Sequence, residues 1–203
     1  MPLIRKPADA QSPPSAPAAD LRSTSADARW HAARASATVG DVHALAEALA
    51  VEADPRVREA ILTSLARIST PAAAHAVVPY VRSDDAGLRT AALDALRAMP
   101  AAVATSLPAL LDDPDADVRL LACEVVRELP GPEASQLLAE LLEREAEANV
   151  CGAAIEVLAE VGGPGVLPAL ARCEARFADQ PFLVFSARVA AERIAARPGD
   201  LLG

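Results

Sequence analysis

The sequence is poor in aromatic residues, in cysteine and in the patterns of β-strands. Of its 203 residues only 2% are Phe, Trp or Tyr, three are Cys and one is Asn. Three thiols cannot supply a disulfide framework, and without alternating runs of Val and Ile a sandwich or barrel is excluded. The chain instead contains 49 Ala, which favours helices packed closely on helices. We therefore predict an all-α protein.

Long apolar runs are also missing. No segment approaches the roughly 18 apolar residues that a membrane span needs. No apolar stretch follows Arg5 and Lys6, as it would in a secretory signal. These features predict a soluble, cytoplasmic protein that does not bind a membrane.

The residue types that most often act as nucleophiles or metal ligands are isolated from one another in this sequence. They are His31, His43, His75, Cys123, Cys151 and Cys173. No three of them have the spacing of zinc ligands. Cys123 and Cys151 stand among Ala and Val, where an inert buried thiol is expected rather than a nucleophile. We predict no metal site, no cofactor and no enzymatic activity.

The chain does contain a proline-rich start followed by a repeat. Residues 1–24 hold five prolines among Ala, Ser and Asp, and they predict a flexible tail. From residue 25 a pattern of about 30 residues recurs five times, aligned on Arg29, Arg58, Arg89, Arg119 and Cys151. Each copy predicts a helical hairpin that is too small to bury its own apolar face. The copies must therefore stack into a solenoid over residues 25–175.

Each of the three middle copies has an Asp four residues before the aligned Arg. These are Asp54, Asp85 and Asp115, with Ser25 at the same place in the first copy. Asp or Ser here can cap the first turn of a helix, and Pro55 fits the position that follows. The spacing also predicts that each Arg reaches back to the Asp of its own helix. Ser25 and Cys151 break the pattern in the two terminal copies.

The repeats resemble a known family. The strings DPRVREA, DAGLRTAA and DADVRLLA, with SLPALL and VLPALA in the second helices, are similar to short bacterial HEAT repeats, the kind also found in phycobilisome lyases. The resemblance covers about residues 25–175 and implies an α-solenoid whose second helices line the concave face. Deoxyhypusine hydroxylase, an iron enzyme on this scaffold, is excluded because its repeated His-Glu pairs are missing here.

The last segment, residues 176–203, leaves the repeat register. We predict a helix over residues 181–196 that caps the solenoid, after Asp179-Gln180-Pro181. Phe177, Phe182 and Phe185 are expected to close the open core of the last hairpin. The alternative is an exposed aromatic docking site.

Charge is uneven along the chain. Residues 112–160 hold 13 acidic and 3 basic side chains, a net charge of −10 against −9 for the whole chain. This excess disfavours DNA and RNA as partners. It predicts a protein partner with a basic patch, and the alternative is that the carboxylates only solubilise the helices.

The candidate partner-binding residues lie on or beside the predicted second helices. They are Glu47, Tyr80, Asp112, Gln136, Glu140 and Glu143. Tyr80 is the single Tyr, and one turn from Ala76 it has the surroundings of an aromatic anchor. Partial burial under the next hairpin is the alternative for this ring.

These observations favour a non-enzymatic adaptor or scaffold for protein–protein interaction, in a setting such as bacterial signalling, chemotaxis included. One rival is a bilin lyase-like subunit or chaperone, which a host without phycobilisomes would exclude. A second rival is a protein that docks through residues 2–6 of its N-terminal tail. Deleting residues 1–20 would then abolish partner binding.

Overall fold

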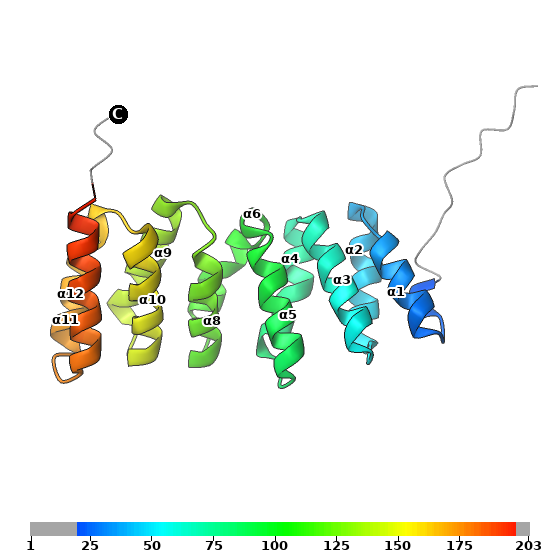
Figure 1. Cartoon of the computed structure of the whole chain (residues 1–203), viewed down its shortest axis with the longest axis horizontal. Coiled ribbons are helices and arrows are strands. Elements are labelled where there is room, and N and C mark those ends of the chain that lie inside the picture. The colour runs from blue at the N-terminus through cyan, green and yellow to red at the C-terminus, as the bar shows by residue number, and fades with distance from the viewer. Residues whose placement is uncertain (1–19, 198–203) are drawn as a thin grey trace, which may run out of the picture.

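A computed structural model describes residues 20–197, and these residues form a row of helical hairpins in two layers (Figure 1). The first layer consists of α1 (Ala26–Ala35), α3 (Pro55–Ile68), α5 (Ala86–Arg97), α8 (Ala116–Val126), α10 (Ala148–Val161) and α12 (Pro181–Ala195). The second layer consists of α2 (Val42–Val51), α4 (Pro71–Val77), α6 (Pro100–Val103), α7 (Leu107–Leu111), α9 (Gly131–Arg144) and α11 (Leu167–Arg176).

Short 3₁₀ segments join or extend these helices. They are η1 (Asp20–Arg22), η2 (Val39–Asp41), η3 (Val78–Arg82), η4 (Ala104–Ser106) and η5 (Pro164–Val166). The part of the chain that the structure covers contains no β-strand. The predicted all-α solenoid of five hairpins is confirmed.

One apolar core runs through all five hairpins. A single cluster of buried side chains extends from Leu21 to Ile194, and Leu and Ala dominate it. Ala33, Ala73 and Ala92 are fully buried, which lets neighbouring backbones approach closely. Each first helix packs on the first helix of the next hairpin, so every hairpin completes the core of its neighbour.

The first helices begin as the capping pattern predicts. The side chains of Ser25, Asp54, Asp85 and Asp115 accept hydrogen bonds from amides in the first turns of α1, α3, α5 and α8. The fifth position, Glu147, caps α10 without a side-chain bond. Side-chain capping of the first helix is therefore missing only in the last copy.

The predicted pairing of each aligned Arg with the Asp of its own helix is wrong. Arg58 Nη1 donates instead to Asp85 Oδ2 of the next hairpin, at 2.9 Å. Arg119 binds Glu145 of the following hairpin through Nε and Nη2, at 2.7 and 2.9 Å. The physical reason is that each aligned Arg reaches past the cap and donates to the carbonyl of the residue two positions before it. Arg29, Arg58 and Arg119 therefore link neighbouring repeats, whereas Arg89 donates to the Ser83 carbonyl of its own copy.

The position two residues before each cap completes this linkage. It is occupied by Ser23, Glu52, Ser83, Asp113 and Glu145. In every copy its side-chain oxygen accepts the amide of the cap residue. Its carbonyl accepts from the aligned residue six positions later, which is Arg in four copies and the Cys151 thiol in the fifth. Cys151 thus occupies the structural place of the Arg.

The folded region begins before Ser25. Most of the predicted tail lies outside the described residues, as do residues 198–203 of the C-terminal segment. The described part of the tail includes η1, which packs on α1 and α2 and buries Leu21.

The predicted helix over residues 181–196 is confirmed as α12, which packs on α10 and α11 like a sixth first helix. The predicted role of its phenylalanines is wrong. Phe182 and Phe185 are 79% and 65% exposed, whereas Leu183 and Ile194 are buried. Phe182 and Phe185 stand three residues apart, on the helix face opposite the one that meets the core. Phe177, at the end of α11, is half-buried under the guanidinium of Arg176.

Candidate functional site

The six predicted partner-binding residues lie in or beside the second helices. Glu47 is on α2, Tyr80 in η3, Asp112 at the end of α7, and Gln136, Glu140 and Glu143 on α9. All are exposed except Tyr80, which is half-buried. The predicted placement of these residues on the second layer is therefore confirmed, while their role in binding stays a prediction.

Three of the four carboxylates, Glu47, Asp112 and Glu143, already have cationic partners within the chain. Asp112 Oδ1 lies 3.5 Å from Arg144 Nε, and the Glu143 carboxylate accepts from Arg172 Nε at 2.9 and 3.0 Å. The hydrogen bond from Arg172 holds the pKa of Glu143 below its ordinary value. These pairs reduce the negative field that a partner would meet on α7 and α9.

Glu140 is the most available carboxylate of the set. Its Oε1 accepts from Gln136 Nε2 at 3.1 Å, and no basic side chain pairs with it within residues 20–197. Glu47, by contrast, pairs with Arg22 at 2.9 Å and with His43 at 3.3 Å. Gln136 and Glu140 therefore form a small polar patch with unused hydrogen-bonding capacity.

The ring of Tyr80 packs partly against the core. Burial raises the pKa of its hydroxyl, while the nearby Arg58 acts in the opposite direction. The structure thus agrees with the alternative of partial burial. A part of the ring stays accessible beside α4.

A second candidate surface lies in the first layer, between α10 and α12. There a groove of 870 Å³ is lined by residues of α8, α10 and α12. Leu120, Ile155 and Val189 contribute apolar side chains, and Phe182 and Phe185 project beside them. The charged residues that line it are both acidic, Glu124 and Glu156. We call this feature the C-terminal groove.

The sequence contained part of the signal for this groove. Phe182 and Phe185 are spaced three apart, while Leu183, Ala187, Ala190 and Ile194 form a separate apolar stripe on the same helix. A helical projection could have separated the two faces. Which of them meets the core depends on how α12 packs on α10.

The described thiols are poorly placed for chemistry. Cys123, Cys151 and Cys173 are all buried. Burial raises the pKa of Cys123 to about 12, so its thiolate is not populated at neutral pH. Among the residues that the structure covers, no three His, Cys, Asp or Glu side chains group as metal ligands do.

No helix within residues 20–197 is both long enough and apolar enough to cross a lipid bilayer.

A family model described as HEAT repeats matches residues 17–97 and 103–179. No curated protein matches the chain. Solved structures with a similar arrangement share little sequence with it. An engineered protein is 19% identical over 89% of this chain and 97% of its own, with a TM-score of 0.47.

Two further structures are similar at the same level. A designed armadillo repeat protein is 17% identical over 87% of this chain and 98% of its own, with a TM-score of 0.44. The complex of CpcE and CpcF of phycocyanin lyase from Nostoc sp. PCC7120 is 17% identical, covering 95% of this chain and 100% of the matched one, with a TM-score of 0.38.

Proposed function

The chain belongs to the HEAT-repeat family, and on that premise we propose that it is a non-enzymatic scaffold that docks a partner protein in the C-terminal groove. HEAT solenoids typically act as protein-interaction scaffolds. The observation that carries the proposal is the exposure of Phe182 and Phe185, at 79% and 65%, beside an apolar groove. Large aromatic side chains left in water next to a groove are typical of binding anchors.

The chemistry of the groove defines the partner. Its apolar walls favour a segment with Leu, Ile or Met side chains, such as one face of an amphipathic helix. Glu124 and Glu156 at its edge both pair with Arg127, at 3.4 and 3.6 Å, which reduces the negative field that a partner would meet there. The apolar walls therefore define the partner more than charge does.

A non-enzymatic role is supported by the state of two of the three thiols. Cys123 has a pKa of about 12, and Cys151 donates its S–H to the Glu145 carbonyl. Both act as packing residues in the repeat rather than as nucleophiles.

Affinity purification from the native host tests the proposal. Wild-type protein and a Phe182→Ala/Phe185→Ala variant would be compared, and only the wild type should retain the co-eluting partner. Val51→Ala is the matched control. Val51 is 84% exposed, but it lies on α2 in the first hairpin, away from the C-terminal groove. Equal recovery of the partner by the double variant would contradict the proposal.

The exposed second-layer residues form a second candidate docking surface. The unused hydrogen-bonding capacity of Gln136 and Glu140 supports it. If they contact the partner, Glu140→Lys should slow its association and reduce the salt dependence of the association rate. Asp84→Lys, at an exposed position before α5 and outside the candidate set, is the control. An unchanged association rate for Glu140→Lys would restrict binding to the C-terminal groove.

A further inference from the structure

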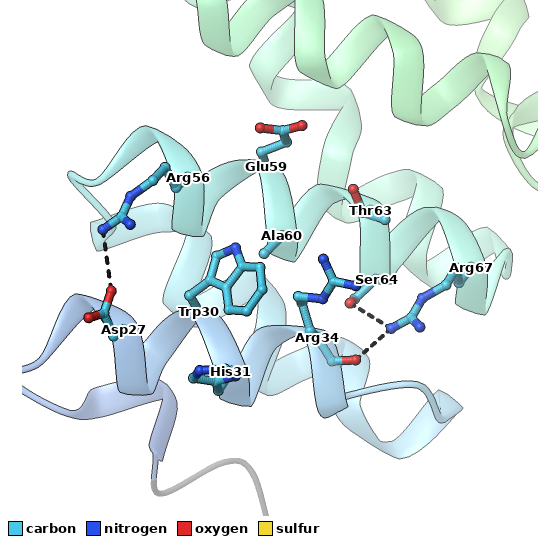
Figure 2. Close-up of a pocket in the computed structure, with 10 residues that line it drawn as sticks. All are labelled: Asp27, Trp30, His31, Arg34, Arg56, Glu59, Ala60, Thr63, Ser64 and Arg67. Atoms are coloured by element: carbon cyan, nitrogen blue, oxygen red, sulfur yellow. Dashed lines mark hydrogen bonds and ion pairs between the residues drawn. The ribbon is translucent and has the colours of Figure 1, made fainter.

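A separate pocket lies at the other end of the first layer, between α1 and α3 (Figure 2). It has a volume of 580 Å³, and Trp30 occupies its centre. Arg34, Arg56 and Arg67 line it, and the Arg34 guanidinium stacks on the indole ring. We call it the Trp30 pocket.

Arg34 is held in place without a carboxylate. Its guanidinium carbon lies 4.7 Å from the centroid of the Trp30 ring, in cation–π contact. His31 packs edge-on against the same ring, with centroids 4.9 Å apart. Within the described ranges, the Arg34 side chain forms no ion pair and donates no hydrogen bond to another residue. The stacking orients the guanidinium and leaves its N–H donors unused.

Arg67 adds fixed positive charge beside it. Arg67 Nη2 donates to the Arg34 carbonyl at 2.9 Å and to Ser64 Oγ at 3.0 Å (Figure 2). It also donates to the Ser36 carbonyl at 3.2 Å. All three acceptors are neutral, so within residues 20–197 no carboxylate pairs with Arg67.

The two acidic residues of the pocket do not occupy this position. Asp27 lies 3.5 Å from Arg56, which also pairs with Asp54. Glu59 points away from Trp30 and Arg34 in Figure 2. The space beside Arg34 and Arg67 is therefore the positively charged part of the pocket.

We propose that the Trp30 pocket binds a carboxylate side chain of an acidic peptide segment. The planar fork of an Arg guanidinium matches a carboxylate in bidentate geometry, and the stacked indole shields that pair from water. The remaining face of Trp30 accepts the aliphatic part of the same peptide.

Trp30 makes the test specific, because it is the single Trp of the chain. An acetylated hexaglutamate peptide would be titrated into the full-length protein while Trp emission is recorded. We expect a saturable change in emission, and binding at least tenfold weaker for the matched hexaglutamine peptide. No saturable change with hexaglutamate would overturn the proposal.

Two pairs of variants distinguish binding in the Trp30 pocket from non-specific electrostatic attraction to the protein surface. Arg34→Gln should weaken binding at least tenfold, whereas Arg193→Gln, which removes the same charge from α12, should not. Thr63→Glu places a carboxylate in the pocket and should block the peptide, while Thr63→Gln should not. Because Thr63 is exposed, these variants keep the test valid if Arg34→Gln fails to fold.

Equal effects of Arg34→Gln and Arg193→Gln, or unaltered binding by Thr63→Glu, would overturn the assignment. A titration with inorganic phosphate forms a separate arm. If phosphate saturates the change in Trp emission at a lower concentration than hexaglutamate does, the pocket prefers phosphate to carboxylate. That result would contradict the proposed ligand class.

Discussion

Single side chains decide which face of α12 holds the solenoid together. Leu183 is 3% exposed and lies against the core, whereas Phe185 is 65% exposed on the same helix. Hydrophobicity alone would rank the Phe as the more important residue. Burial reverses that order, because stability depends on the apolar area removed from water.

We predict that Phe185→Ala changes the free energy of unfolding by less than about 0.5 kcal/mol. Leu183→Ala should cost about 2 to 4 kcal/mol, since it removes buried methyl groups from a packed site. Urea denaturation of both variants provides the measurement. A loss above about 2 kcal/mol for Phe185→Ala would mean that the aromatic ring packs in solution.

The buried carboxylate of Glu52 is a second point where one residue joins two repeats. Arg29 of the preceding hairpin donates to it at 2.7 and 2.9 Å, and the amides of Ala53 and Asp54 donate as well. The hydrogen bond from Arg29 holds the pKa of Glu52 below its ordinary value, although burial opposes this. The folded state therefore binds fewer protons at Glu52 than the unfolded state does.

It follows that Glu52 contributes stability above its unfolded pKa of about 4.3, and that this contribution is lost as the pH falls further toward the folded pKa. We predict that Glu52→Gln lowers stability at pH 7 by about 2 to 3 kcal/mol and flattens the decline of Tm between about pH 5 and pH 3. Glu47→Gln, which breaks an exposed pair, should cost at most about 1 kcal/mol. Thermal unfolding across this pH range measures both, and parallel pH profiles of wild type and Glu52→Gln would refute the assignment.

At the scale of the element, each first helix begins by the same local device, but the fifth departs from it. Asp115 accepts the amide of Asp117 at 2.9 Å in α8, whereas Glu147 makes no such bond at the start of α10. Glu145 accepts the amides of Ala146 and Glu147 before α10, as Asp113 accepts the amide of Asp115 before α8, so the two helix starts differ in the side-chain cap.

Asp115→Ala should accordingly destabilise the protein by about 1 kcal/mol, the usual cost of losing a side-chain cap. Glu147→Ala should leave stability within about 0.5 kcal/mol of the wild type. Chemical denaturation of the two variants, with Asp115→Asn as a conservative control, tests this difference. Equal losses at both positions would show that capping geometry is not what distinguishes α8 from α10.

Residues 20–197 form a linear stack in which each hairpin packs on its neighbours. Its stability is therefore close to a sum of repeat and interface terms. No part of the core depends on contact between the first and last repeats.

We predict that a fragment ending at residue 130, before α9, remains helical in far-ultraviolet circular dichroism but has a lower Tm and a smaller urea m-value than the full chain. The smaller m-value follows because less surface is exposed on unfolding. The full chain supplies the reference spectrum. A fragment that loses its helical signal entirely would contradict nearest-neighbour stacking, and substantial strand content in either protein would contradict the fold.

The repeat, the helices and their starts were determined by the sequence itself, because they rest on local physics. Asp54, Asp85 and Asp115 act within one turn of their own helices, and the apolar spacing of about 3.6 residues is a property of each segment alone. The second-layer positions of Glu140 and Glu143 followed from the same register.

Which side chains pair between neighbouring repeats was decided only by the tertiary structure. Arg58 and Arg119 could be aligned from the sequence, but their carboxylate partners belong to the next hairpin, 27 and 26 residues away. The exposure of Phe185 and the stacking of Arg34 on Trp30 likewise depend on how neighbouring helices pack. Local spacing carries no information on the rotation and separation of two stacked helices, and those quantities decide which side chains meet.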